Sequence, residues 1–290
     1  MDNLIIFTEF VLMDISSSGE LEILQGLMFL VIYLSALAGN LLTIIIIVMD
    51  SSLHLPMYFF IGNLSLIDFG FISVIIPKLI MNSLIGSKLI SVKACAAQTV
   101  LIISFGSTEI FFLVVMSYDR FVAICHPLHY GLTMTPRLCT QVAGVSWAGG
   151  LVSSAVHTGT IFRPPFTVSN VIHQFFCDVP QVLSISSQEV QCPECVTLAV
   201  SACIVLLCSV ILFSSYIHIF SAVLQMHSAE AQNKALSTCS PQIATFILFV
   251  MSALFAYLSP ISHVSTIENL LTAMFNCMVR HFANPLIFSL

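Results

Sequence analysis

Seven long apolar segments dominate this chain and restrict what it can fold into. An α-helix rises about 1.5 Å per residue, so about 20 apolar residues cross the roughly 30 Å hydrocarbon core of a bilayer. We therefore expect an all-α membrane protein in which residues 1–290 form a single domain, a seven-transmembrane helix bundle. A short N-terminal segment, 1–22, would precede the first span. The expected spans are 23–49, 57–85, 95–118, 138–162, 196–226, 235–262 and 269–290.

The composition supports the same class. The chain is 58% hydrophobic and 8% charged, whereas soluble domains contain roughly 25% charged residues. A soluble protein with so little charge could not cover its surface, so the lipid bilayer is an expected partner. The sequence has no basic run that would indicate nucleic-acid binding. It also has no phosphate-binding loop and no nucleophile–base set, so we do not expect an enzyme or a protein that requires a metal.

The cysteines indicate which face of the membrane is outside. Cys95 stands at the start of the third span, and Cys177 lies in the longest loop, 163–195. If they share a face they could pair, and a disulfide persists only on the oxidising side of a membrane. Such a pair would put the N-terminus outside, although the distribution of basic residues between the loops does not itself favour that orientation.

Two acids lie within expected spans. Asp68 is in the second span and Glu109 is in the third. A charge at the bilayer centre costs at least about 2.5 kcal/mol, so such side chains usually face the bundle interior. One interpretation is a shared cation or water site. The other is two separately solvated or protonated residues that fix helix packing, and these residues alone leave both open.

An adjacent acid and base, Asp119-Arg120, follows the apolar part of the third span. The dipeptide alone favours an interfacial pair that ends the helix. The alternative is a switch, in which Asp119 holds Arg120 in one state and releases it to another partner in a second state.

A single Cys-x-x-Cys motif, Cys192-Pro193-Glu194-Cys195, ends the longest loop. A structural zinc site needs four ligands, and no second pair accompanies this one. The pattern therefore favours a local loop disulfide or free thiols over a metal site or redox catalysis.

Several motifs in the chain resemble those of one receptor family. The run 116–130, Met-Ser-Tyr-Asp-Arg-Phe-Val-Ala-Ile-Cys-His-Pro-Leu-His-Tyr, closely resembles the signature of vertebrate olfactory receptors, a branch of the rhodopsin-like G-protein-coupled receptors. Further matches follow in family order over essentially the whole chain. They are Gly39-Asn40, Pro56-Met57-Tyr58-Phe59-Phe60, Leu64-Ser65-Leu66-Ile67-Asp68, Ser215-Tyr216, Lys234-Ala235-Leu236-Ser237-Thr238-Cys239 and the run 284–290, Asn-Pro-Leu-Ile-Phe-Ser-Leu.

The resemblance implies a rhodopsin-like bundle in the plasma membrane with an extracellular N-terminus. It implies a small, weakly polar odorant bound between the helices and a stimulatory olfactory-type G protein as partner. It further implies that Cys95 pairs with Cys177, and that Asp68 and Glu109 form an inner polar pair where a sodium ion can sit.

The resemblance also implies a G-protein switch. Its members would be Asp119 and Arg120, with Tyr216 as the partner of a released Arg120, together with Asn284 and Pro285 of the last span.

Position along the helices, counted outward from Arg120, supplies candidate residues for the odorant pocket. A mostly apolar lining with few hydroxyls suits a weakly polar ligand. The candidates are Ile102, Ile103, Phe105, Gly106, Val200, Ser201, Ile204, Val250, Ala253 and Tyr257.

The sequence departs from the family at several points. Phe121 and Phe288 stand where the family usually has Tyr, Arg280 interrupts the last apolar segment, and no Asn-x-Ser/Thr sequon precedes the first span. The chain stops at Leu290, without the C-terminal cytoplasmic helix that the resemblance leads one to expect. These departures motivate an alternative, a non-signalling receptor-like protein that traffics poorly and is retained in the endoplasmic reticulum.

Overall fold

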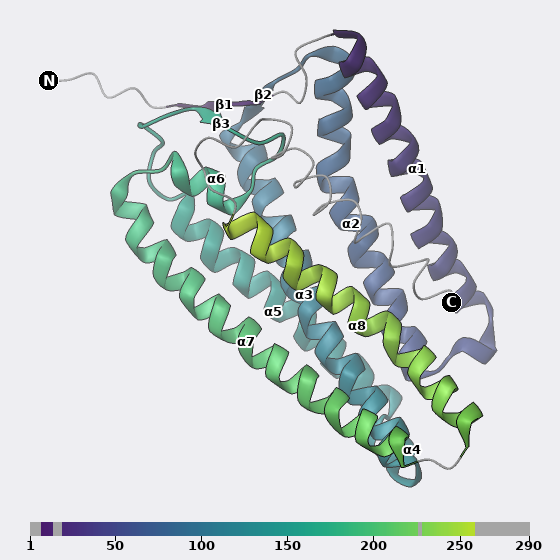
Figure 1. Cartoon of the computed structure of the whole chain (residues 1–290). Helices are drawn as coiled ribbons and strands as arrows, with labels where there is room; N and C mark the ends of the chain where they lie inside the picture. The colour runs from purple at the N-terminus through teal and green to yellow at the C-terminus, as the bar shows by residue number, and fades with distance from the viewer. Residues whose placement is uncertain (1–6, 14–18, 226–227, 259–290) are drawn as a thin grey trace, which may run out of the picture.

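The computed structural model describes residues 7–13, 19–225 and 228–258, and Figure 1 shows them as a bundle of long helices with a small sheet at one end. The first six expected spans are confirmed as helices over the residues that the structure describes, and the seventh, 269–290, lies outside them. The long helices are α1 (Gly19–Met49), α2 (Pro56–Ile85), α3 (Val92–Cys125), α5 (Pro136–Ile161), α7 (Gln188–Leu224) and α8 (Ala229–Leu258).

Short elements connect the long helices at the two ends of the bundle. At one end lie the 3₁₀ turns η1 (Ser51–Leu53) and η2 (Pro127–His129) and the helix α4 (Tyr130–Thr133). At the other lie α6 (Val179–Ser184) and the strands β1 (Glu9–Leu12), β2 (Leu89–Ser91) and β3 (Val171–Ile172). We call these the Asp119 end and the disulfide end, after the residues described below.

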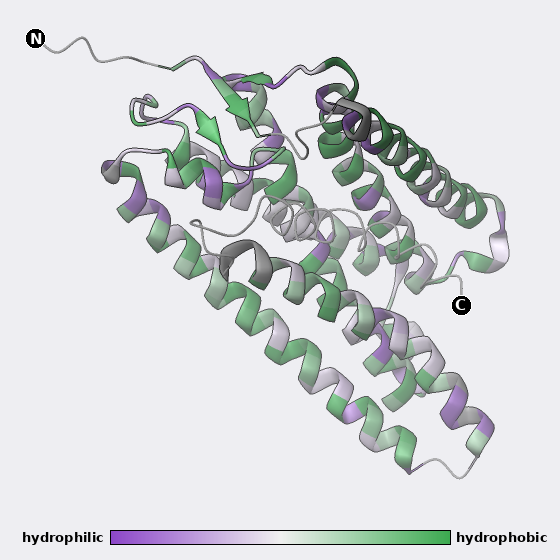
Figure 2. Cartoon of the chain, turned by 45° about the horizontal axis from the view of Figure 1, so that its top comes forward, coloured by the Kyte–Doolittle hydropathy of each residue, from purple (hydrophilic) through white to green (hydrophobic). Residues whose placement is uncertain are grey.

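Many large apolar side chains of the long helices are exposed, and Figure 2 shows that hydrophobic residues make up much of these helices. Within the most apolar 18-residue stretch of each helix, 11% of the residues are buried in α1 and in α7, compared with 56% in α2. Since water would not tolerate so much exposed apolar surface, these outer faces suit lipid. Among the described residues, α1, α2, α3, α7 and α8 have the length and hydropathy of membrane spans.

Helix α5 is as long as a span but less apolar, because small residues mediate its packing. A Cβ atom added to Gly150 would lie 2.0 Å from Thr108 Oγ1 and 2.6 Å from the Ser104 carbonyl oxygen, both on α3. Only glycine permits this approach of the two backbones. Small residues at such contacts are common in membrane bundles, where close packing replaces the hydrophobic driving force.

Helix α3 is the central element, and it contacts α2, α5, α7 and α8. The Ser91 side chain accepts a hydrogen bond from the Ala94 N–H and so caps its first turn. The helix continues to Cys125, so the prediction that Asp119-Arg120 ends it is wrong. It ends instead before the His126-Pro127 pair, because a residue that precedes proline is disfavoured in helical conformation.

The N-terminal segment belongs to the sheet at the disulfide end. Strand β1 lies between the other two strands, antiparallel to β2 and parallel to β3. Phe10 and Leu12 of β1 are buried in one cluster with Cys95 and Cys177. The long predicted loop, 163–195, is thus partly ordered as β3, α6 and the first turns of α7, which begins at Gln188 rather than after Cys195.

Candidate functional site

The disulfide end is held by a covalent bond between α3 and the loop that follows α5. Cys95 and Cys177 form the predicted disulfide, with Cα atoms 5.5 Å apart, and both residues are fully buried. Gln98, one turn further along α3, donates from Nε2 to the Val74 carbonyl of α2 and accepts at Oε1 from the Cys177 N–H. One side chain therefore joins α2, α3 and the loop beside the disulfide.

Asp178, the residue after Cys177, caps α6 by accepting a hydrogen bond from the Val179 N–H at 2.9 Å. Burial raises the pKa of the Asp178 carboxyl to about 6, and the hydrogen bond from Val179 only partly opposes this shift. The charge at this turn therefore changes in mildly acidic solution.

The pocket candidates on α3 lie in different surroundings. Ile102 packs against the cluster formed by α1 and α2, while Ile103 packs against the cluster around the disulfide. Phe105 contacts Trp147 of α5 edge to face, with ring centroids 6.2 Å apart. A Cβ added to Gly106 would have no neighbour within 4 Å among the described residues. Gly106 is therefore the α3 candidate beside open space.

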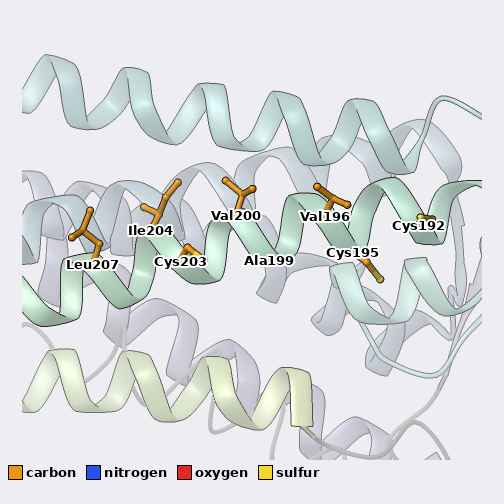
Figure 3. Close-up of a pocket in the computed structure, with 8 residues that line it drawn as sticks. All are labelled: Cys192, Cys195, Val196, Ala199, Val200, Cys203, Ile204 and Leu207. Atoms are coloured by element: carbon orange, nitrogen blue, oxygen red, sulfur yellow. The ribbon is translucent and has the colours of Figure 1, made fainter.

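Two of the candidates on α7 do not lie between helices. Val200 is 55% exposed and Ile204 is 44% exposed. Both line an open apolar groove along α7, and Figure 3 shows their side chains pointing to the same side of the helix. This corrects the prediction for these residues. Counting along a helix gives depth but not rotation, and the rotation of α7 turns them outward.

Ser201, the third candidate on α7, joins a buried polar cluster with His157 of α5 and Glu194 of α7. His157 Nδ1 lies 2.5 Å from Glu194 Oε1, and His157 Nε2 lies 2.9 Å from Ser201 Oγ. A carboxylate only accepts hydrogen bonds, so Nδ1 carries a proton, and in the neutral ring Nε2 accepts from the Ser201 hydroxyl. His157 and Glu194 are 5% and 0% exposed, and Glu194 Oε2 has no hydrogen-bond partner among the described residues.

Sequence reasoning missed His157 and Glu194. The loop was predicted to extend to Cys195, which placed Glu194 outside the fifth span, although it lies seven residues before Ser201. Seven residues are about two helical turns, so the two side chains share a face if the helix starts early. The other usable signal was His157, the only histidine in a fourth span that has no Asp, Glu, Lys or Arg.

The candidates on α8 lie near the same part of α3. Val250 packs against the cluster of Ile110, Cys208 and Phe249, which joins α3, α7 and α8. Ala253 is partly buried one turn further along, and the side chain of Tyr257 lies outside the described part of the structure.

The two acids in the middle of the bundle are both buried. Asp68 on α2 is 1% exposed and Glu109 on α3 is 0% exposed. Neighbouring helices carry them, since α2 packs against α3. Two buried carboxylates call for a proton, a cation or donors that neutralise them.

At the Asp119 end, a tyrosine holds Asp119. Tyr130 of α4 donates a hydrogen bond from its hydroxyl to Asp119 Oδ1 at 2.8 Å, and Asp119 is 1% exposed. Burial, and then the hydrogen bond to Asp119, raises the pKa of Tyr130 well above its ordinary value. The hydroxyl therefore stays protonated and keeps donating at physiological pH. The sequence pointed to Arg120 as the partner of Asp119 and gave no reason to choose Tyr130.

Tyr216 of α7 is a buried hydroxyl near Arg120. It is 3% exposed, and its oxygen has no hydrogen-bond partner among the described residues. Tyr216 belongs to the apolar cluster against which Phe121, the residue after Arg120, packs. An unpaired buried hydroxyl costs about 1–3 kcal/mol, which a conformation that supplied a partner would recover. Asn284 and Pro285, the other expected switch residues, lie outside the described residues.

A further polar contact joins α8 to α3 in this half of the bundle. Gln242 donates from Nε2 to the Leu113 carbonyl at 2.7 Å, and its side chain is buried at 2% exposure. Separation of α8 from α3 would break this hydrogen bond.

Comparisons with known proteins agree on one family. Residues 39–288 match the family model described as the 7 transmembrane receptor of the rhodopsin family. The chain is 48% identical to human olfactory receptor 14I1 over 290 residues, which cover 100% of this chain and 93% of that receptor. It is 46% identical to human olfactory receptor 14A2 over 292 residues, covering 100% and 92% of the two chains. The crystal structure of squid rhodopsin has the same fold, with a TM-score of 0.71 at 19% identity, over 96% of this chain and 83% of that one.

Proposed function

Because the chain belongs to the olfactory receptors, within the rhodopsin-like family of seven-transmembrane receptors, we propose that it binds a small, weakly polar odorant within its helix bundle and activates a stimulatory olfactory-type G protein. As a member of that family it is a multi-pass plasma-membrane protein and a signalling receptor rather than an enzyme.

The observation that carries the proposal is the difference between the contacts at the two ends of α3. At one end α3 is fixed by the Cys95–Cys177 disulfide. At the other, Asp119 is held by Tyr130 while the Tyr216 hydroxyl near Arg120 has no partner among the described residues. The Tyr216 hydroxyl is thus available as a second partner for Arg120. This supports a switch between two states, of which the structure shows the first.

The disulfide also supports the proposed orientation. Disulfides persist on the oxidising side of a membrane, so the disulfide end faces outward and the Asp119 end faces the cytoplasm, where a G protein would bind. The N-terminal strand β1 pairs with β2 and β3 at the same end, which supports an extracellular N-terminus.

The proposed ligand site lies in the outer half of the bundle, beside Gly106. Its walls would be Phe105 of α3, Val250 and Ala253 of α8, and the Ser201 side of α7. Most of these groups are apolar, and the polar cluster of His157, Glu194 and Ser201 borders them. Such a lining favours a small ligand with one polar group over a charged one.

We further propose that a sodium ion binds near the buried carboxylates of Asp68 and Glu109. Their burial on adjacent helices is what supports it, because two ionised carboxylates in a dry site repel one another. A cation there would favour the state in which α2 and α3 remain close.

The test is ligand-dependent nucleotide exchange. Protein reconstituted in nanodiscs with a stimulatory heterotrimeric G protein should accelerate exchange on that G protein when a matching compound from a panel of small volatile molecules is added. Folding is checked in parallel by thermal unfolding of the protein, followed by the fluorescence of Trp147, the single tryptophan.

The alternative, a non-signalling and poorly trafficked receptor-like protein, makes the opposite prediction. Folded protein would leave exchange unchanged with every compound, and an N-terminally tagged form would remain inside the cell when unpermeabilised cells are stained. Surface staining together with exchange rules out this alternative.

A further inference from the structure

We propose that Cys192 and Cys195 form a thiol modification site at the outer end of α7, where a small-molecule disulfide such as oxidised glutathione converts them reversibly into an intrahelical disulfide. The inference does not depend on the identity of the odorant or of the G protein. It rests on the position, exposure and surroundings of the two thiols.

The two cysteines are helical neighbours rather than loop residues. Helix α7 begins at Gln188, so Cys192 and Cys195 lie three residues apart on one face of it. Side chains at this spacing have Cβ atoms about 5–6 Å apart. A disulfide requires about 3.5–4.5 Å between Cβ atoms, so a small local adjustment of the helix is sufficient.

Pro193 makes that adjustment easier. It lies between the two cysteines, inside the helix. Proline has no N–H group, so the hydrogen bond that would otherwise run from residue 193 back to the Glu189 carbonyl is missing. The backbone between the two thiols is therefore less constrained than an uninterrupted helical turn.

Both thiols are free and exposed, which few of the other cysteines are. Among the described free cysteines, Cys139, Cys208 and Cys239 are buried. Cys192 and Cys195 line the open groove along α7, and Figure 3 shows them near its outer end, followed by Cys203. Glu194 points the other way, into the cluster with His157, and leaves the thiol face accessible.

The location provides the oxidant. The first turns of α7 lie at the same end of the bundle as the sheet that surrounds the Cys95–Cys177 disulfide, as Figure 1 shows. The span 189–224 contains 36 residues, or about 54 Å of helix, against roughly 30 Å of hydrocarbon. The first turns therefore project beyond the hydrocarbon on the oxidising side, whereas Cys203 lies about 12 Å deeper than Cys195.

The reaction is a two-step thiol–disulfide exchange. The thiolate of one cysteine attacks a sulfur of oxidised glutathione, forms a mixed disulfide and releases one glutathione thiolate. The thiolate of the other cysteine then attacks the protein sulfur of that mixed disulfide and releases the second glutathione. Two protein thiols are oxidised, one small disulfide is reduced to two thiols, and excess reduced glutathione reverses both steps.

The consequence for the bundle follows from the residue enclosed by the new ring. The ring contains Glu194, whose carboxylate holds His157 of α5. Oxidation would therefore fix the turn of α7 that carries the α5–α7 polar contact, whereas reduction would let it relax.

The sequence offers a direct test, because Glu194 separates the two cysteines. Nanodisc-embedded protein is incubated with oxidised glutathione, the remaining thiols are alkylated, and the protein is cleaved with a protease that cuts after glutamate. Cleavage after Glu189, Glu194 and Glu230 puts Cys192 and Cys195 in separate fragments. We expect most of the protein to yield these two fragments linked by a disulfide that a reductant opens.

Two variants identify the bond. Cys203→Ser, the matched control in the same groove, should leave the linked fragments unchanged. Cys195→Ser should abolish the link and leave a glutathione adduct on Cys192. The proposal is overturned if the wild-type fragments carry separate alkyl or glutathione groups, or if the link survives in Cys195→Ser and vanishes in Cys203→Ser.

Discussion

The two ends of the bundle are built to different degrees of rigidity. At the disulfide end, α3 is tied to the following loop by a covalent bond and to α2 by Gln98, and a three-stranded sheet covers it. At the Asp119 end, individual side-chain contacts such as Tyr130–Asp119 and Gln242–Leu113 connect the helices. The residues that make these contacts, such as Cys95 and Asp119, are buried at both ends. The ends therefore differ in the kind of bond that connects the helices rather than in burial.

This difference teaches how one helix can serve two purposes. A binding site gains affinity when its walls are already ordered, because less conformational freedom is lost on binding. A switch needs contacts that exchange partners for a few kcal/mol, as a hydrogen bond does and a disulfide does not. The arrangement therefore assigns recognition to the disulfide end of α3 and response to the Asp119 end.

The largest expected effect comes from removing the covalent tie. The Cys95–Cys177 disulfide closes a loop with a sequence separation of 82. The double variant Cys95→Ser/Cys177→Ser lacks this disulfide, so its free energy of unfolding should be lower by about 4 kcal/mol. We expect the midpoint of thermal unfolding, followed by Trp147 fluorescence, to fall by roughly 5–15 °C. Cys203→Ser should change it little, because that thiol is free and exposed. An unchanged midpoint in the double variant would remove the proposed rigidity of this end.

The second prediction concerns a variant that changes the Asp119 end and leaves the disulfide end intact. Arg120→Ala should reduce ligand-dependent nucleotide exchange on the G protein at least tenfold and change ligand affinity less than threefold. Arg120 is partly exposed on α3, far from the proposed pocket beside Gly106, so its removal takes away a switch contact and no wall of the pocket. Exchange and ligand binding are measured on the same nanodisc preparation. Loss of both would show that the two ends do not work separately.

The third prediction concerns the strength of the contact that holds the resting state. Tyr130→Phe removes the hydrogen bond to Asp119, which is worth about 1–2 kcal/mol. A shift of that size changes the ratio of two states by roughly fivefold to thirtyfold. We therefore expect ligand-independent nucleotide exchange to rise severalfold.

Tyr118→Phe is the matched control for that experiment. It removes the same atom from the same region, but Tyr118 is 45% exposed. Its exchange rate without ligand should equal that of the wild type. Equal rates in all three proteins would mean that Tyr130 contributes to folding and not to the switch.

The sequence predicted six of the helices now described and the disulfide, because apolar length and family motifs depend on residue type alone. It did not predict the extension of α3 past Asp119, since charged residues can continue a helix as well as end it. It placed Val200 and Ile204 in the pocket because rotation about a helix axis is set by packing against neighbouring helices. It missed His157–Glu194 because that contact joins residues 37 apart in sequence on two helices.

The smallest expected effect is a difference between the two ends in how their carboxyl groups make stability depend on pH. The pKa of Asp178 at the disulfide end is raised to about 6 from 3.8. Between these values the folded protein binds more protons at this site than the unfolded chain does, so its contribution to stability decreases as the pH rises and is constant above about pH 6. Asp178→Asn keeps the cap on α6, because asparagine also accepts from the Val179 N–H, and it removes the titration.

The measurable quantity is the difference in unfolding midpoint between Asp178→Asn and the wild type, which should change by a few degrees from pH 4 to pH 6 and then level off. Asp50, at the Asp119 end, supplies the control of opposite sign. Hydrogen bonds from the Ser52 side chain and backbone lower the pKa of this exposed carboxyl, so Asp50→Asn should give a constant difference over the same range and diverge only at lower pH. A constant difference for Asp178→Asn as well would mean that its carboxyl is not desolvated, and that the disulfide end is more open to water than its burial indicates.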